Sequence, residues 1–158
     1  MADEKHSRDE QAKLFSKNDK AWWQSIEDAD HGMKDGQALW AQPDADLREW
    51  KEIKVPGYIQ ENGLPGVNGI VWLRTEVTIP DSWTDKELTL NLGPVDDNDI
   101  TFFNGKEIGR TDGWMAPRSY KIPASMVKGG KATVTVRVTD TGASGGMYGS
   151  ADGVNLTD

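Results

Sequence analysis

The sequence predicts an all-β domain, a jelly-roll β-sandwich of the galactose-binding-domain-like type, preceded by an N-terminal helical segment. Beyond Trp50, short runs rich in Val, Ile, Leu and Thr alternate with turn residues at about ten-residue spacing, which is typical of a sandwich or jelly roll. Before residue 30, the apolar residues recur at helical rather than alternating spacing. We therefore expect a helical segment or linker over residues 1–30 and the sandwich over residues 31–158.

Residues 7–28 form the predicted helix. Ser7 and Glu10 have the spacing of a capping box. A broken apolar stripe follows, which consists of Leu14, Phe15, Trp22, Trp23 and Ile26. Asn18 and Asp19 interrupt this stripe, so a break into two short helices is an alternative. The two adjacent tryptophans need an apolar surface to pack on, either in this chain, in another domain or in a neighbouring copy.

Residues 31–46 are rich in Gly, Asp and Pro and predict a long irregular approach to the sandwich. Trp40 is the one large apolar anchor in this approach. We expect His31, next to Gly32, to end the helix rather than to titrate in a mechanism.

Two runs of alternating residues predict long strands. In residues 70–79, Val71, Leu73, Thr75, Val77 and Ile79 fall on one face, and Trp72, Arg74, Glu76 and Thr78 fall on the other. Pro80 ends this strand. In residues 132–139, the three valines point inward, and the outward set comprises Thr133, Thr135, Arg137 and Thr139. A shorter run of alternating leucines, residues 88–92, predicts another strand.

The dipeptide Asn104-Gly105 predicts a β-hairpin with a type I′ turn, because both central residues of that turn take positive φ. Just upstream, Asp96, Asp97 and Asp99 place three carboxylates within four residues, where we expect the chain to reverse. Their mutual repulsion must be offset by cations, hydrogen-bond donors or water.

We expect these acids to belong to a structural acid–arginine network. An extended chain puts Asp97 and Asp99 on one side and Asp96 on the other, so at least one of them should face inward and meet a guanidinium group. The candidate partners are Arg74, Arg118 and Arg137. Structural calcium at Asp96, Asp97 and Asp99 is the competing explanation, since clustered carboxylates suit a hard cation, although the spacing matches no calcium-loop pattern. Beyond that alternative, we expect no metal and no cofactor.

Composition excludes several classes of function. Lys and Arg number 18 against 26 Asp and Glu, and the net charge of -8 argues against a nucleic-acid partner. The chain contains 0 cysteines, which excludes a disulfide framework, a thiolate zinc site and a cysteine nucleophile. The sequence shows no long apolar run and no signal-like segment, so we expect a soluble domain without a membrane partner.

No residue has the context of a catalyst. A nucleophilic serine needs a base within hydrogen-bond reach, and the 2 histidines, His6 and His31, lack a triad context. Three acids on one turn also lack the opposed geometry that glycoside hydrolysis requires. We therefore expect no catalytic residues and no enzyme activity in this chain alone.

A set of motifs in matching order resembles one family. The motifs are Trp50-Lys51 with Pro56-Gly57, Trp72-Leu73-Arg74, Pro80, Leu92-Gly93, Asp96-Asp97-Asn98-Asp99, Asn104-Gly105 with Ile108-Gly109, Arg118-Ser119-Tyr120 with Ile122-Pro123, and Val136-Arg137-Val138 with Asp140. Across residues 28–149 the chain resembles the jelly-roll domain inserted into sialate O-acetylesterase-type (SGNH) carbohydrate esterases. That insert is itself similar to the sugar-binding domain of β-galactosidase-type glycoside hydrolases.

The chain departs from this family in two places. Ala132 stands where the family usually has Asn before its last core strand. The esterase half is missing, because the sequence has no Gly-Asp-Ser or Gly-Gln-Ser nucleophile block and no Asp-x-x-His pair downstream. The chain thus looks like the insert without its enzyme.

The resemblance implies a noncatalytic carbohydrate-binding module derived from a sugar O-acetylesterase. Trp114 and Tyr148, both in glycine-bearing loops, would supply aromatic platforms, with Asp112 and Arg118 as polar contacts. The partner would be a glycan, whether acetylated or of the galactose, sialic-acid or xylan type, and the location periplasmic or secreted. The alternative is a purely structural insert that orients the esterase catalytic domain and binds no glycan, in which Trp114 covers an open sandwich edge and Tyr148 packs against the catalytic half.

Overall fold

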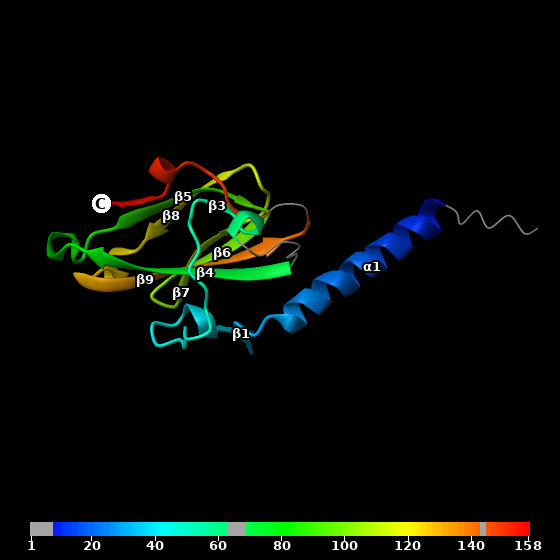
Figure 1. Ribbon diagram of the computed structural model, residues 1–158, viewed down its shortest axis with the longest axis horizontal. Coiled ribbons are helices and arrows are strands. Elements are labelled where there is room, and N and C mark those ends of the chain that lie inside the picture. Colours follow the sequence, from blue (N-terminus) through cyan, green and yellow to red (C-terminus); the bar gives the residue numbers. More distant parts are fainter. Residues whose placement is uncertain (1–7, 63–68, 143–144) are drawn as a thin grey trace, which may run out of the picture. The chain divides into compact units, whose positions relative to one another are not determined.

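The computed structural model describes residues 8–62, 69–142 and 145–158. The chain divides into two compact units, Met1–His31 and Gly32–Asp158, and each is described by itself (Figure 1).

The first unit is one helix, α1 (Arg8–Ala29), which confirms the predicted helix. The helix is continuous, so the alternative of two short helices is wrong: Asn18 and Asp19 lower helix propensity only modestly, unlike Pro or Gly. Trp22 and Trp23 pack edge to face, with ring centroids 5.2 Å apart. Ser7 lies outside the described residues, so its capping box stays a prediction. Among the described residues, no helix is long and apolar enough to cross a membrane.

The second unit is a β-sandwich, which confirms the predicted fold class. One sheet has the strand order β4-β9-β6-β7, and the other has the order β11-β5-β10-β3 with β8 also paired to β5. The strands are β3 (Gly57–Tyr58), β4 (Gly69–Ile79), β5 (Leu88–Asp96), β6 (Asn98–Phe103), β7 (Lys106–Thr111), β8 (Pro117–Ile122), β9 (Gly130–Asp140), β10 (Gly146–Met147) and β11 (Asn155–Thr157).

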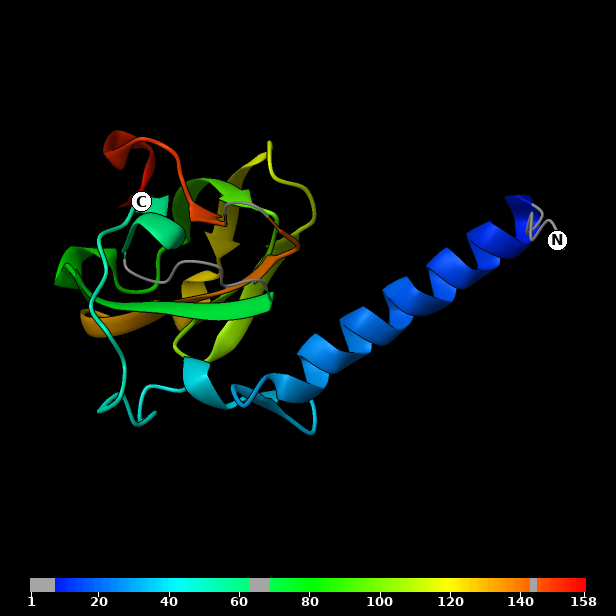
Figure 2. The ribbon, with the colours of Figure 1, turned by 45° about the vertical axis from the view of Figure 1, so that its right-hand side comes forward.

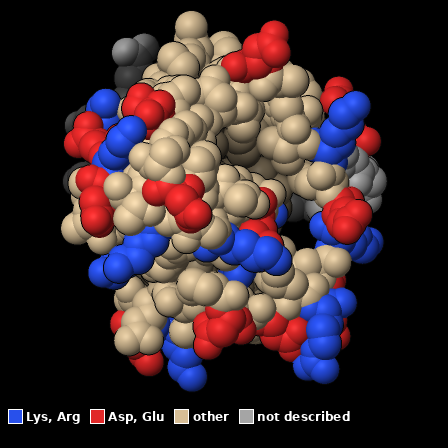
Figure 3. Space-filling model, turned by 90° about the vertical axis from the view of Figure 1, so that its left-hand side faces the viewer, with Lys and Arg blue, Asp and Glu red and all other residues tan. Residues whose placement is uncertain are grey.

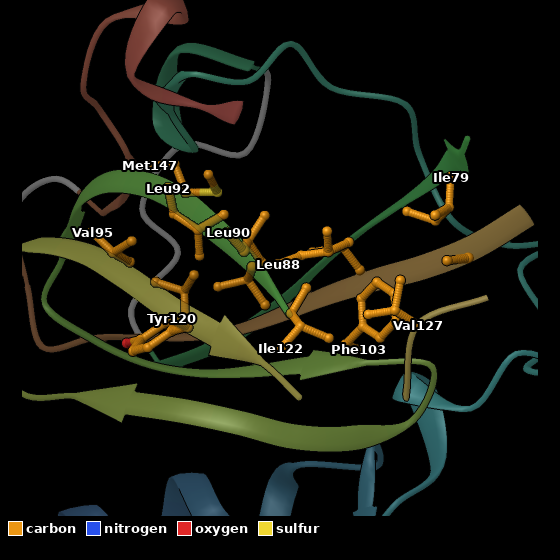
Figure 4. Packing of buried hydrophobic residues seen from close by; sticks show 14 residues of the cluster. Ile79, Leu88, Leu90, Leu92, Val95, Phe103, Tyr120, Ile122, Val127 and Met147 are labelled. Atoms are coloured by element: carbon orange, nitrogen blue, oxygen red, sulfur yellow. The ribbon is translucent and has the colours of Figure 1, made fainter. Parts of the chain in front are cut away.

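The two long predicted strands pair with each other along their whole length. β4 and β9 run antiparallel from the pair Gly69–Asp140 to the pair Ile79–Gly130. As predicted, Leu73, Val77 and Ile79 pack in or against the interior core. The core side chains of the two sheets point toward one another between the layers (Figure 4). Its buried members are Ile79, Leu88, Leu90, Leu92, Val95, Phe103, Tyr120, Ile122, Val127, Ala132, Val134, Val136, Val138 and Met147.

The predicted hairpin is present. β6 and β7 pair around Asn104 and Gly105, whose φ angles are 47° and 85°, as a type I′ turn requires. The Asn104 side chain accepts a hydrogen bond from the backbone N–H of Thr133 at 2.8 Å, which ties the turn to β9.

Part of the outer face of the four-stranded sheet is buried, at Trp72 and along most of β9, whereas the alternation alone suggested an outward polar face. Arg137 is 4% exposed and Thr135 is 0% exposed. The approach segment lies over this face, and its Trp40 packs edge to face on both Trp50 and Trp72. The alternation therefore predicted the face of each residue but not its burial.

The approach segment is more regular than predicted. It contains a short hairpin, β1 (Met33–Lys34) and β2 (Gln37–Ala38), and a 3₁₀ helix, η1 (Leu39–Ala41). The Arg74 guanidinium fastens the segment by donating hydrogen bonds to the carbonyl oxygens of Trp40, Gln42 and Pro43. Arg74 is thus bound to backbone carbonyls rather than to the acidic corner.

Candidate functional site

Four segments far apart in the sequence meet at one end of the sandwich. They are β3 with the residues after it (57–60), the β5–β6 corner (96–98), the loop after β7 (112–116), and the end of β9 together with the residues in and around β10 (140–142 and 145–149). β10 pairs with both β3 and β5, which joins three of the four segments. The backbone N–H of Gly113 donates to the Asn98 side chain at 2.9 Å, which connects the fourth segment, the loop after β7, to the β5–β6 corner. Figure 2 shows the yellow-green loop after β7 and the orange end of β9 on the same side of the sandwich.

A buried ion pair lies beneath this end. The Arg118 Nε donates to the Asp99 carboxylate at 2.6 Å, and both side chains are 0% exposed. Asp99 faces inward because it pairs in register with Val138, and the hydroxyl groups of Tyr120 and Thr101 donate to its carboxylate as well. Asp99 on one sheet is thereby linked to Arg118 and Tyr120 on the other.

Arg118 also holds the loop after β7. Its Nη1 donates to the carbonyl of Ala116, and its Nη2 donates to the carbonyls of Asp97 and Thr111 at 3.0 and 3.3 Å. Sequence reasoning gave Arg118 two roles, sugar contact and acid partner. The structure buries it in the network, where each nitrogen of the guanidinium has a protein acceptor.

Asp96 and Asp97 form a carboxyl pair at the surface of this end. The pKa of Asp96 is raised to about 7, mainly because the carboxyl group is desolvated. A hydrogen bond to Asp97 and the negative charge of Asp97 contribute further to this rise. Desolvation opposes ionisation of Asp97 too, but hydrogen bonds from the Thr141 hydroxyl and backbone N–H outweigh it and lower the Asp97 pKa. At mildly acidic pH, the pair therefore carries one proton, held by Asp96.

Sequence reasoning did not single out Asp140 and Gln60 as site residues. The Gln60 amide donates to the buried Asp140 carboxylate at 3.0 Å and accepts from the backbone N–H of Gly145 at 3.0 Å. Asp140 continues the inward alternation of Val134, Val136 and Val138, a signal that could have found it. Gln60 carried no comparable signal.

The structure brings the two predicted aromatic residues together. The Tyr148 hydroxyl donates to the backbone carbonyl of Trp114. Tyr148 also stacks on Tyr58, with ring centroids 5.5 Å apart and planes 8° apart. The hydrogen bond from Tyr148 holds the loop in place, and Trp114 is 53% exposed, so more than half of its surface is open to solvent. Asp112 lies exposed in the same loop. Desolvation and the nearby negative charge of Asp96 raise the pKa of Tyr148.

The three acids of the corner do not converge on one point. The Asp99 carboxylate accepts from Arg118, Tyr120 and Thr101, while Asp97 accepts from Thr141. Within the described parts of the chain, no group of three or more His, Cys, Asp or Glu residues is arranged to hold a metal ion.

A hollow of about 510 Å³ lies between the β1–β2 hairpin and the β6–β7 hairpin. Its apolar lining includes Met33, Leu39, Ile100 and Phe102, and its charged residues, Glu107 and Arg110, pair with each other. Phe102 is the aromatic residue of this lining and is only 5% exposed, so the hollow offers a sugar ring a smaller aromatic surface than the Trp114 loop does.

No protein-family model matches the chain, and no curated protein matches it. Solved structures do match. The chain is similar to a β-glucuronidase from an uncultured Clostridium, at 27% identity and a TM-score of 0.56 over 64% of this chain and 18% of that one. It is also similar to Bacteroides uniformis β-glucuronidase (21% identity, TM-score 0.61, covering 74% and 16%). A third match is a glycosyl hydrolase family 2 member from Bacteroides cellulosilyticus (18% identity, TM-score 0.61, covering 73% and 18%).

The chain thus spans less than a fifth of the length of each of these structural neighbours. The expected likeness to a sandwich domain of glycoside hydrolases is confirmed at the level of the fold, because the neighbours are two β-glucuronidases and a glycosyl hydrolase family 2 member.

Proposed function

We propose that this chain is a noncatalytic carbohydrate-binding module of a larger sugar-active protein. The observation that carries this proposal is the exposed ring of Trp114 in a loop fastened by Tyr148 and Arg118. The flat face of a Trp ring stacks on the apolar face of a pyranose. Because the loop is already ordered, binding would cost little conformational entropy.

Polar contacts are available around this ring. The Asp112 carboxylate lies two residues before Trp114, and the backbone of the glycine-bearing loop offers further donors and acceptors. A few such groups beside one platform suit a shallow, modest-affinity sugar site.

A noncatalytic role fits the carboxyl geometry. Asp96 and Asp97 are neighbours that hydrogen bond to each other, whereas glycoside hydrolysis needs two carboxyl groups on opposite sides of the scissile bond. The order of the sequence motifs further favours a sugar O-acetylesterase as the parent protein, with export to the periplasm or the medium and an acetylated, galactose-, sialic-acid- or xylan-type glycan as partner.

The second candidate is a structural insert that orients the catalytic domain of the parent protein and binds no glycan. Met115 is 69% exposed beside Trp114, so the loop tip presents two adjacent apolar side chains. Such a tip is also suited to burial against another protein surface.

Titration of the purified chain with a glycan panel separates the two candidates. The panel contains sialic acid, galactosides and xylan fragments, and Trp fluorescence reports binding. We expect a saturable change with at least one glycan, and loss of that change in Trp114→Ala. Leu47→Ala serves as the control, since it removes an exposed apolar side chain from the approach segment. No response to any glycan favours the structural insert, and hydrolysis of an acetyl ester above background would overturn the noncatalytic assignment.

A further inference from the structure

Helix α1 presents an apolar face near its C-terminal end. Trp22 and Ile26 are four residues apart, so they lie one turn above the other on the same side of the helix. Trp23 borders this row, and its ring meets that of Trp22 edge to face. These three residues are only partly buried, and the other residues of the range 19–29 are exposed. Such a face leaves water only when another apolar surface packs on it.

Two opposite charges border this apolar face on one side. Lys20, Trp23 and Glu27 follow one another at spacings of three and four residues, so one charge precedes the Trp23 ring along the helix and the other follows it. Lys20 and Glu27 are both exposed. Within the helix, neither has an oppositely charged residue three or four positions away. The other border of the face is uncharged, since Ser25 and Ala29 form it.

The C-terminal end of α1 lacks positive charge. Its last turn contains no basic residue, whereas Glu27 and Asp28 both lie in that turn and Asp30 follows it. Negative charge at this end of a helix opposes the helix dipole, and a cation there is stabilising. On the face of the molecule in Figure 3, by contrast, Lys and Arg side chains are interspersed with Asp and Glu. A partner that brings a lysine to the last turn would therefore relieve an unfavourable arrangement of charge.

We propose that α1 pairs antiparallel with α1 of a second copy of this chain. A two-fold axis that crosses the helix close to Trp23 places Lys20 of each copy opposite Glu27 of the other, so two equivalent ion pairs form. The same register sets Trp22 of each helix beside Ile26 of the other and brings a lysine to each acidic last turn. In a parallel pair, opposite borders meet, so Lys20 and Glu27 would face the uncharged border of the partner. Charge therefore favours the antiparallel arrangement.

Sedimentation equilibrium of the full chain measures this association. The contact is small, so we expect a weak dimer with a dissociation constant of about 10–100 µM. Trp22→Ala keeps a good helix former at this position and should weaken the dimer by about tenfold or more. Leu47→Ala, which removes an exposed apolar side chain from the approach segment, should leave the dissociation constant unchanged. A chain that stays monomeric at about 1 mM, as it would if this face packed on another surface, overturns the inference.

Charge-swap variants and cross-linking test the orientation. Lys20→Glu and Glu27→Lys should each weaken the dimer about tenfold, because each creates two like-charge pairs, and the double variant that carries both changes should restore it. The chain has 0 cysteines, so introduced cysteines report the register directly. An equimolar mixture of the Lys20→Cys and Glu27→Cys variants should oxidise mainly to the mixed disulfide. Preference for a disulfide between identical variants, or a double variant as weak as the single ones, overturns the antiparallel arrangement.

Discussion

Replacement of Asp99 by Asn should destabilise the sandwich strongly. The change keeps the shape of the side chain but leaves the Arg118 guanidinium buried without its counter-charge, 2.6 Å from a neutral group. Removal of one partner from a buried ion pair costs about 3–5 kcal/mol, which corresponds to a fall in Tm of roughly 6–20 °C for a chain of this size.

Asp46→Asn is the matched control. Asp46 and Arg48 form an ion pair with the same separation, 2.6 Å, but their side chains are 59% and 87% exposed. Water screens that pair, so we expect no measurable change in stability. Urea and thermal unfolding followed by Trp fluorescence and circular dichroism measure both variants.

A double replacement completes the test. Asp99→Leu combined with Arg118→Met removes both charges, and apolar replacement of a whole buried pair is often close to neutral. The double variant should therefore be more stable than Asp99→Asn alone. Equal losses of stability in Asp99→Asn and Asp46→Asn would refute the reasoning, because burial would then have no effect on the energy of the pair.

Three further predictions follow from the same end of the sandwich and from the strand that approaches it. The Asp96 pKa is raised to about 7 in the folded chain, so the folded state holds a proton that the unfolded chain releases near pH 3.8. The free energy of unfolding should therefore fall as pH rises from about 4 to 7. In Asp96→Asn, the urea midpoint should no longer decrease over this pH range. Tyr148→Phe removes the hydrogen bond to the Trp114 carbonyl. Glycan affinity should therefore drop, and amide hydrogen exchange in residues 112–116 should become faster at unchanged Tm. Unaltered exchange would show that this hydrogen bond does not hold the loop. Gly109→Ala places a Cβ against the ring of Tyr120, so unfolding should become easier by about 1–3 kcal/mol, and a variant as stable as the wild type would contradict the packing.

Local patterns were sufficient to predict the strands and the hairpin. Period-2 alternation gave both faces of β4, and the φ requirement of Asn104-Gly105 gave the turn, because each depends only on residues close in sequence. Burial of the outer face of β9 could not be predicted in the same way. It depends on residues 33–50 folding back over the sheet, a contact between residues far apart in the chain.

The candidate site was predicted only in part for the same reason. The loop aromatics Trp114 and Tyr148 were found from glycine-bearing loops, and the structure joins them by a hydrogen bond. Tyr58 and Gln60 were missed, since they enter the site through the pairing of β3 with β10, which no local pattern indicates. Arg118 was assigned a ligand contact because exposure cannot be read from residue type.

Nuclear magnetic resonance of the Trp indole N–H groups gives the most direct test of the central claim, which is that Trp114 is the sugar platform. The chain has 7 tryptophans, so each can be followed separately as a neutral oligosaccharide is added. We expect the Trp114 signal to shift to saturation while that of Trp72, buried beneath the approach segment, stays in place. Saturable shifts at other tryptophans with a fixed Trp114 signal would contradict the claim.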